Sequence, residues 1–452
     1  MRALLVSTYE LGHQPLGVAS PAAALLAAGQ DVRCLDLSVE PWRPELVDWA
    51  EAVAFSVPMH TAMRLALRAA RAIRRRRPEL PICLYGLYAP VSRDLTVGAV
   101  ADRVIAGEYE PALVAWLDGL AAGSQGPGRY TLALERTGFE LPARHLLPPL
   151  ERYAHVAFDG EERPVGYVET THGCRHRCRH CPLPAVYDGA LRVVGRDAVL
   201  ADVEQLVAMG ARHITFGDPD FLNGPGHSLR IVRALHAHFP ELTFDCTVKV
   251  EHVLDHAGMW PELAASGCLF VVTAVELLND EILARLDKGH TAAGAAAAVE
   301  LLRRHGIEPR PTFLPFTPWT TLDDVLDLLD FIVRHDLVGN VDPVQYSLRL
   351  LLPEGSLLLD AADPVLREAL GPYDDERLTY TWRSADPMVD LLQARLAELV
   401  EGSVAAGEPA AEAFAGVRAA VLEVAGTGVE EELAIPAGST EGRPRLTEPW
   451  FC

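Results

Sequence analysis

The sequence predicts an α/β protein with three parts: a doubly wound, Rossmann-like parallel sheet, a partial (β/α)6 barrel of the TIM type and a C-terminal helical region. Short apolar runs alternate with helical patterns over residues 1–122, and this alternation resumes after residue 165. After residue 356 the strand signal is lost and the chain becomes rich in Ala, Glu and Leu. The expected segments are a sheet domain (1–122), a linker (123–164), a barrel (165–356), a helical region (357–435) and a tail (436–452).

The apolar runs give the expected strands in order. Those of the first sheet lie at 3–7, 32–35, 52–56, 82–85 and 104–106. Those of the barrel lie at 166–170, 213–216, 242–249, 269–275, 309–314 and 342–348. Helices are expected between them, and two more at 387–401 and 410–423. Both sheet types bind ligands at the carboxyl ends of their strands, so the loops there are the candidate sites.

Composition narrows the class of protein. The 452 residues include 40 Lys and Arg against 62 Asp and Glu, a formal net charge of −22. Nucleic-acid partners need a basic surface, so none is expected. No apolar run reaches the roughly 18 residues of a membrane span, and the apolar start is too short for a signal peptide. Eight cysteines suit metal or catalytic use in a reducing compartment, so we expect a cytoplasmic protein without a membrane partner.

A cysteine motif follows the first barrel strand. Cys174, Cys178 and Cys181 have the spacing CxxxCxxC, which lets three thiolates from one loop reach different irons of one cubane. Three ligands leave one iron open to a small chelating molecule. The alternative is a structural zinc site, which needs a fourth ligand. The histidines available for it are His172, His176 and His180.

This motif after the first strand of a partial barrel resembles the radical S-adenosylmethionine (SAM) superfamily. The resemblance implies that Cys174, Cys178 and Cys181 hold a [4Fe–4S] cluster whose fourth iron is chelated by SAM. It implies reductive cleavage of SAM to a 5′-deoxyadenosyl radical that abstracts hydrogen from the substrate. It also implies an electron donor such as flavodoxin or ferredoxin, and a small-molecule or peptide substrate.

Four further positions carry the same resemblance. Gly217, Asp218 and Asp220 follow the second barrel strand, where relatives contact the amino group of SAM, although the Gly-Gly-Glu pattern of many members is absent. Glu276 follows the fourth strand, where relatives contact the ribose. The alternative for the two aspartates is helix capping.

The first sheet resembles the cobalamin-binding domain that precedes the barrel in one radical SAM class. Gly107 and Glu108, after its last strand, are similar to the GEGE-like turn of that class. The Asp-x-His-x-x-Gly motif of base-off cobalamin proteins is missing, and in its place His13 is separated from Gly17 by one residue too many. The resemblance implies that cobalamin binds, either with His13 on cobalt or without a protein ligand. The alternative is that His13 is an ordinary loop residue.

The tail resembles one subgroup whose chains end in Cys-Cys-Ala-Glu-Pro or Cys-selenocysteine-Ala-Glu-Pro. Residues 317–321, 350–356 and 448–452 carry this similarity, and the sequence stops at Cys452, the first cysteine of such a tail. We expect a tail truncated there, with a UGA codon for selenocysteine read as a stop. The alternative is a genuine terminus, and the codons after Cys452 distinguish the two.

Two classes of function follow. The first is a radical SAM enzyme that modifies an unactivated carbon, either by cobalamin-dependent methylation or by a non-methylating reaction such as rearrangement, cleavage or aminocarboxypropyl transfer. The second is a non-catalytic iron–sulfur or zinc protein, for which the acidic chain offers no basic recognition helix. No short motif identifies the substrate.

Overall fold

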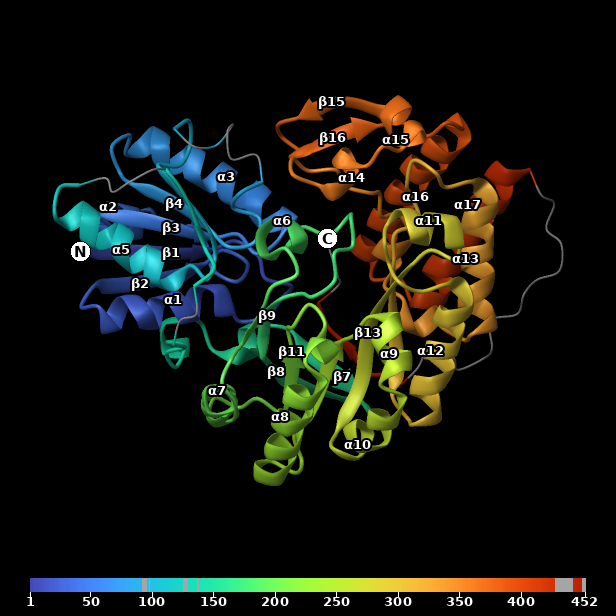
Figure 1. Ribbon diagram of the computed structural model, residues 1–452, viewed down its shortest axis with the longest axis horizontal. Helices are drawn as coiled ribbons and strands as arrows, with labels where there is room; N and C mark the ends of the chain where they lie inside the picture. Colours follow the sequence, from blue (N-terminus) through green and yellow to red (C-terminus); the bar gives the residue numbers. More distant parts are fainter. Residues whose placement is uncertain (92–95, 97, 125–128, 136–137, 427–441, 449–452) are drawn as a thin grey trace.

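The computed structural model describes residues 1–91, 96, 98–124, 129–135, 138–426 and 442–448 (Figure 1). Its first sheet has six parallel strands in the order β2-β1-β3-β4-β5-β6. The strands are β1 (Arg2–Ser7), β2 (Asp31–Asp36), β3 (Ala52–Ser56), β4 (Ile82–Tyr85), β5 (Arg103–Gly107) and β6 (Tyr130–Ala133). The five strands predicted here are confirmed, and β6 adds a sixth that the sequence did not predict.

Helices cover both faces of this sheet, as the doubly wound prediction requires. The helices α1 (Leu16–Ala27) and α5 (Glu110–Ala121) cover one face, and α2 (Pro44–Trp49) and α3 (His60–Arg76) cover the other (Figure 1). Their apolar side chains form a separate core on each face of the sheet. Apolar residues recur on one side of α3 at helical spacing, from Ala62 to Ile73, and this stripe is buried. The helices leave the carboxyl ends of the strands uncovered. The loops that follow these strand ends face the second sheet.

The second sheet has the order β14-β13-β12-β11-β8-β7-β17 and forms a half barrel. Its last two strands are β7 (His155–Phe158) and the short β17 (Arg445–Leu446), which pairs with β7 in antiparallel orientation. Its parallel strands are β8 (Glu161–Val168), β11 (His213–Phe216), β12 (Thr243–Thr247), β13 (Cys268–Glu276) and β14 (Glu308–Phe313). A shared apolar core joins their outer face to the surrounding helices. These helices are α7 (Arg196–Ala208), α8 (Pro225–His238), α9 (Val250–Asp255), α10 (Trp260–Ala265), α11 (Asp280–Arg285), α12 (Ala292–Arg304) and α13 (Leu322–Arg334).

The sixth barrel strand, predicted over 342–348, is wrong, because the chain there forms the 3-10 helix η6 (Pro343–Tyr346). The neighbouring strand explains the difference. The N–H of Phe313 points away from β13 and donates to a side-chain oxygen of η6 at 2.9 Å. Pro309 and Pro311 occupy the alternate positions before Phe313 and have no N–H to donate on that edge. A regular ladder therefore cannot form beside β14.

The segment between the two sheets holds more regular structure than the predicted linker. Besides β6, it contains the 3-10 helices η1 (Arg144–Leu146) and η2 (Leu150–Arg152) and the strand β7 (His155–Phe158). Asp159 and Gly160 turn β7 into antiparallel β8 with φ of 53° and 74°. Two left-handed residues in a row suit a tight hairpin, and Asp-Gly is a favoured pair for it.

The C-terminal region contains the two predicted helices, as α16 (Pro387–Ala406) and α17 (Ala410–Ala425), and two short ones, α14 (Leu357–Asp360) and α15 (Pro364–Ala369). The expectation that strands are absent there is wrong. β15 (Leu370–Asp374) and β16 (Thr379–Trp382) form an antiparallel hairpin. Tyr373 and Tyr380 face each other across it with ring centroids 5.0 Å apart, a pair that favours strand pairing.

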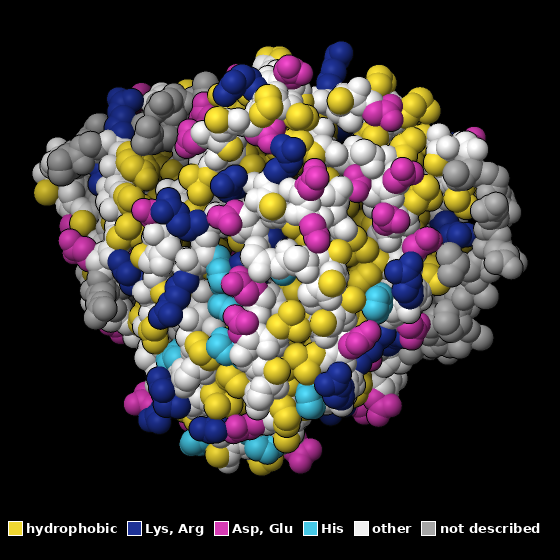
Figure 2. All heavy atoms as spheres, turned by 45° about the vertical axis from the view of Figure 1, so that its right-hand side comes forward, with side chains coloured by type: hydrophobic (Ala, Val, Ile, Leu, Met, Phe, Trp, Pro, Cys, Tyr) yellow, Lys and Arg dark blue, Asp and Glu magenta, His cyan; other side chains and the backbone are white. Residues whose placement is uncertain are grey.

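The composition predicts a charged surface and no membrane-spanning helix. None of the helices in the described ranges is both long and apolar enough to cross a bilayer. On the face shown in Figure 2, acidic and basic side chains are interspersed with apolar ones. Such a mixed charged surface is typical of a well-solvated protein.

Candidate functional site

The three cysteines of the motif lie on one loop. This loop runs from β9 (Thr171–Gly173), which pairs with β10 (Leu191–Val193), to α6 (Leu183–Tyr187). Cys174 and Cys178 are 9% and 8% exposed, Cys181 is half-buried, and all three thiols are free. Burial raises the pKa of Cys174 and raises that of Cys181 to about 12. Metals bind thiolates, so iron must displace these protons when it binds.

Asn223 holds the first cysteine. Its amide Nδ2 lies 3.4 Å from Cys174 Sγ, and its Oδ1 accepts the N–H of Arg175 at 3.2 Å. Amide hydrogen bonds to a ligating sulfur orient it and tune the metal centre. The sequence alone does not single out Asn223, although this residue stands in the same loop as the predicted Asp218 and Asp220.

Asp218 fixes the start of the cysteine loop. It accepts the Thr170 N–H at 3.0 Å, and the hydroxyls of Thr170 and Thr171 at 2.7 and 2.6 Å. Burial raises its pKa to about 6 even though these hydrogen bonds oppose the rise. Gly217 beside it is required by packing, because a Cβ there would lie 2.0 Å from the ring of Tyr167.

Asp220 has a second role at the same edge. It caps the 3-10 helix η3 (Phe221–Asn223), which agrees with the capping alternative. Its Oδ2 lies 2.7 Å from His252 Nδ1 and 3.6 Å from His176 Nε2, so the three side chains could hold a metal ion. However, Lys249 Nζ lies 2.9 Å from His176 Nδ1 and donates to it. In a neutral ring the proton is then on Nε2, which becomes a donor toward Asp220 and not a metal ligand.

Glu276 ends β13 in a strained conformation. Its φ is 66°, and the pairing of β13 with β14 shifts register there. Lys288 Nζ lies 2.8 Å and His180 Nε2 3.2 Å from its Oε1. Burial alone would raise the pKa of Glu276, but these two groups hold it well below its usual range. The carboxylate is therefore ionised and held beside the cysteine loop.

The histidines proposed as a fourth zinc ligand point to carboxylates from other elements. His172 Nδ1 lies 2.9 Å from a carboxylate oxygen of Glu108. His176 Nε2 lies 3.6 Å from Asp220 Oδ2, and His180 Nε2 lies 3.2 Å from Glu276 Oε1. Because these histidines face carboxylates, the three cysteines of the loop remain without a fourth histidine ligand, which favours a cluster with an open corner over closed zinc coordination.

A cleft of about 220 Å³ separates the carboxyl ends of the two sheets. The first sheet contributes Gly107, and the second contributes Gly217 and Tyr167. Among the described residues, its titratable lining includes His172 and four carboxyl groups and no Lys or Arg; the carboxyl groups are those of Glu10, Glu108, Glu110 and Glu169. Burial raises the pKa of Glu10 to about 8, and its Oε2 has no hydrogen-bond partner among the described residues.

One chain of polar contacts joins the cleft to the cysteine loop. Tyr187 donates to Glu108 at 3.1 Å, and Glu108 contacts His172 at 2.9 Å. The other ring nitrogen of His172 lies 3.2 Å from Glu169, which accepts from Tyr167 at 3.0 Å. The predicted Gly107–Glu108 turn is therefore linked directly to the strand that carries the cysteine motif.

His13 does not line this cleft. It is buried against Tyr167, with ring centroids 4.9 Å apart, and burial lowers its pKa to about 4. Its Nδ1 has no hydrogen-bond partner in the part of the chain that the structure describes. The structure thus brings Gly107, Glu108 and Gly217 to one cleft and leaves His13 behind its wall. Cys452 lies outside the described residues.

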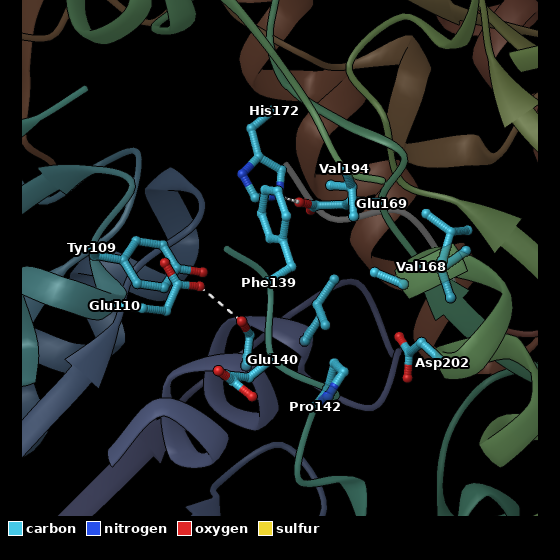
Figure 3. A pocket seen from close by; sticks show the side chains of 14 residues that line it. Tyr109, Glu110, Phe139, Glu140, Pro142, Val168, Glu169, His172, Val194 and Asp202 are labelled. Atoms are coloured by element: carbon cyan, nitrogen blue, oxygen red, sulfur yellow. Dashed lines mark hydrogen bonds and ion pairs between the residues drawn. The ribbon is translucent and has the colours of Figure 1, made fainter. Parts of the chain in front are cut away.

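A smaller pocket of about 40 Å³ adjoins the cleft (Figure 3). In that view Tyr109 and Glu110 of the first sheet domain face His172 and Glu169 across it, with Phe139 between them. The rings of Phe139 and His172 meet edge-on at 5.4 Å. Phe139 therefore lines the smaller pocket next to the polar chain.

Two family profiles match the chain. The Radical SAM superfamily profile covers residues 168–332 and the B12 binding domain profile covers residues 2–117. A hopanoid C-3 methylase of Methylococcus capsulatus is 26% identical over 334 residues. That match covers 67% of this chain and 61% of the methylase, less than two thirds of its length.

Solved structures share the fold. The cobalamin-dependent SAM radical enzyme OxsB, with aqua-cobalamin bound, has a TM-score of 0.68 at 15% identity, covering 89% of this chain and 67% of that one. The radical SAM methyltransferase TsrM of Kitasatospora setae, with tryptophan and a SAM analogue bound, has a TM-score of 0.65 at 17% identity, covering 87% of both chains. At these identities the likeness concerns the fold alone.

Proposed function

This chain belongs to the radical SAM superfamily and carries an N-terminal B12-binding domain, and on that premise we propose that it cleaves SAM reductively at a [4Fe–4S] cluster. The observation that carries the proposal is the group of three free, largely buried thiols on the loop after β9. When bound, the cluster supplies the electron that breaks the sulfonium bond and yields the 5′-deoxyadenosyl radical.

The surrounding residues have separate tasks in this proposal. Asp218 fixes the entry to the loop and Asn223 donates to Cys174. Glu276, held ionised by Lys288, offers a carboxylate acceptor beside the loop for a hydroxyl-bearing ligand such as ribose. Asp218 has both oxygens engaged by Thr170 and Thr171, so its task is to position the loop and not to contact SAM directly.

We propose that cobalamin occupies the cleft between the two sheets and that methylation of a carbon is the reaction. The cleft lies between the B12-binding domain and the radical SAM domain, so a ligand in it meets both. Carboxylate oxygens there can accept the N–H groups of the corrin amides. Of the histidines in the described part of the chain, His172 alone lines the cleft, so cobalamin would bind without His13 on cobalt. The methylase and methyltransferase relatives favour methylation over the non-methylating alternatives.

The setting of the reaction is part of the proposal. We expect a small-molecule or peptide substrate, a protein electron donor such as flavodoxin or ferredoxin, and no nucleic-acid partner. An acidic chain with unpaired cysteine thiols suits the cytoplasm.

Anaerobic reconstitution with iron and sulfide tests the proposal. The expected result is a cluster whose EPR signal changes when SAM is added, together with 5′-deoxyadenosine after reduction by dithionite. Methyl-labelled SAM, added with cobalamin, should leave label on the protein-bound corrin. Zinc held by four protein ligands, or an EPR signal indifferent to SAM, would overturn the radical SAM function. Formation of 5′-deoxyadenosine without label transfer would overturn methylation alone.

A further inference from the structure

Three arginines alternate with other residues along the cysteine loop. Arg175, Arg177 and Arg179 are all exposed, whereas Cys174 and Cys178 between and beside them are buried. We call these three residues the arginine loop. They stand in a chain whose formal net charge is −22, so a local excess of positive charge contrasts with the molecule as a whole.

The positive charge of the arginine loop is poorly neutralised. The side chain of Arg175 has no ion-pair partner within the described part of the chain. Arg177 lies 2.9 Å from Asp188, but both side chains are more than half exposed, at 59% and 71%. Arg179 donates only to the carbonyl of Arg285, at 3.4 Å. One solvated carboxylate against three guanidinium groups leaves a basic patch, since exposed pairs of this kind contribute little.

The backbone explains why the guanidinium groups face outward. The N–H of Arg175 donates inward to Asn223 at 3.2 Å, and the N–H of Arg179 donates to the carbonyl of Leu286 at 2.9 Å. The loop is thus tied to the protein at both ends. Thiols then point inward and the long cationic side chains reach solvent, each within one residue of a cysteine.

We propose that the arginine loop is the docking site of a small acidic one-electron carrier protein. The inference rests on the proposed function, because the patch matters only if a cluster behind it must be reduced. One electron leaves the reduced centre of the carrier, which is oxidised, and enters the cluster, which is reduced, and the loop itself gains or loses no proton. Charge complementarity raises the association rate and fixes orientation, and its contribution falls with ionic strength.

The position of the patch also favours this partner over a substrate. Among the described residues, the lining of the cleft between the sheets includes Glu108, Glu110 and Glu169 against one basic side chain, His172. Carboxylates thus outnumber basic groups there, whereas guanidinium groups outnumber carboxylates at the arginine loop. An acidic protein would therefore be attracted more strongly at the arginine loop than at the cleft.

The test compares two reductants on the reconstituted holoenzyme. The triple variant Arg175→Gln, Arg177→Gln and Arg179→Gln is assayed for 5′-deoxyadenosine with reduced flavodoxin and, separately, with dithionite. The matched control removes three exposed arginines from a helix of the first sheet, as Arg68→Gln, Arg71→Gln and Arg75→Gln. We expect the flavodoxin concentration for half-maximal rate to rise about tenfold or more in the loop variant only. Its dithionite rate should stay within about twofold of the unchanged protein, since surface charges are screened.

Further readouts separate the possible outcomes. Iron content and the affinity for oxidised flavodoxin, measured by calorimetry at low and high salt, are recorded for each variant. Weaker, salt-insensitive flavodoxin binding in the loop variant alone supports the proposal, even if no SAM cleavage is seen and the proposed function fails. An equal loss of rate with both reductants, or of iron, would show that the loop serves the cluster and would overturn the docking site. Unchanged flavodoxin dependence would overturn it as well.

Discussion

Arg144 and Asp202 form a two-pronged ion pair in the interior, with Nη2 2.7 Å from Oδ2 and Nε 3.1 Å from Oδ1. Their side chains are 0% and 7% exposed. The same guanidinium donates to the carbonyl of Tyr167 at 2.6 Å and to that of Gln14 at 3.3 Å. One buried cation therefore joins η1, α7, the strand β8 and the loop after β1, and so ties the two sheets together.

Removal of the Arg144 guanidinium should lower the free energy of unfolding of the protein. In Arg144→Leu the carboxylate of Asp202 stays buried without its partner, which costs about 3–5 kcal/mol. Thermal unfolding should shift downward by many degrees, and Arg144→Leu combined with Asp202→Leu should recover part of the loss. The control is Arg196→Leu, whose pair with Asp197 is 53% and 85% exposed. It should cost at most about 1 kcal/mol. Equal melting temperatures for Arg144→Leu and Arg196→Leu would contradict the role of Arg144.

Substitution of a cysteine of the motif should reduce iron binding far more than substitution of a cysteine elsewhere in the chain. Alanine at Cys174, Cys178 or Cys181 removes one of three thiolates, so iron content and 5′-deoxyadenosine formation should fall to background. Cys34→Ala removes a thiol from β2, in the first sheet, and should keep both. Iron and sulfide analysis after anaerobic reconstitution measures the first effect. Normal iron content in any one of the three motif variants would contradict the ligand assignment.

Glu10 should make the stability of the apoprotein depend on pH. Burial raises its pKa from 4.5 to about 8, so the folded state keeps a proton that the unfolded state releases. Below pH 4.5 Glu10 is protonated in both states, so it does not change the free energy of unfolding. As the pH rises from there to about 8, the free energy of unfolding falls, because the unfolded state releases the proton first. Glu10→Gln keeps an acceptor for the Gly17 N–H and cannot ionise. At pH 7 it should be more stable by on the order of 2–4 kcal/mol, with no gain at pH 4.5.

The matched control for Glu10 is Glu398→Gln, which removes an exposed carboxylate from α16. Its melting temperature should track the unchanged protein at every pH. If Glu10→Gln tracks the unchanged protein too, the carboxyl group is solvated and ionised in the fold, contrary to the buried position described above.

Gly107 should be required for the shape of the cleft between the two sheets, where we propose that cobalamin binds. Its φ is 82°, and a Cβ there would lie 2.0 Å from the carbonyl oxygen of Ala133. Gly107→Ala must therefore push β6 away from β5, and retention of cobalamin, followed by its visible absorption after gel filtration, should fall at least about tenfold. Gly123→Ala has a similar φ of 72° but open space around the Cβ, so it carries backbone strain alone. Similar losses for both variants would contradict the packing argument.

Much of the fold follows from local patterns in the sequence. Buried parallel strands are short apolar runs, so β1, β3 and β11 could be placed to within a residue or so. The missing sixth barrel strand depended on Pro309 and Pro311 in the strand beside it, a non-local effect that the apolar pattern of 342–348 does not contain. The hairpin of β15 and β16 was missed because its strands are short and only half-buried.

The sequence predicts those parts of the candidate site whose chemistry depends on the spacing of residues along the chain. The spacing of Cys174, Cys178 and Cys181 predicts a set of three cluster ligands from the sequence alone. Asn223 could not be found in this way, because an asparagine in a polar loop has many roles and only the fold brings it to Cys174. His13 as a cobalt ligand stays a prediction: the sequence does not show that this residue lies outside the lining of the cleft whereas its neighbour Glu10 lies in it.

The two prolines of β14 have a consequence beyond the barrel. A half barrel leaves its last strand without a partner strand, and such an edge is a template on which chains aggregate through intermolecular sheets. Side chains cover part of this edge here, because Asn340 donates to the carbonyl of Pro309 and Gln345 accepts the N–H of Phe313. With N–H groups missing at Pro309 and Pro311, that edge offers too few donors for a second copy to extend it. The feature that ends the barrel early thus also guards the molecule against fibrous self-association.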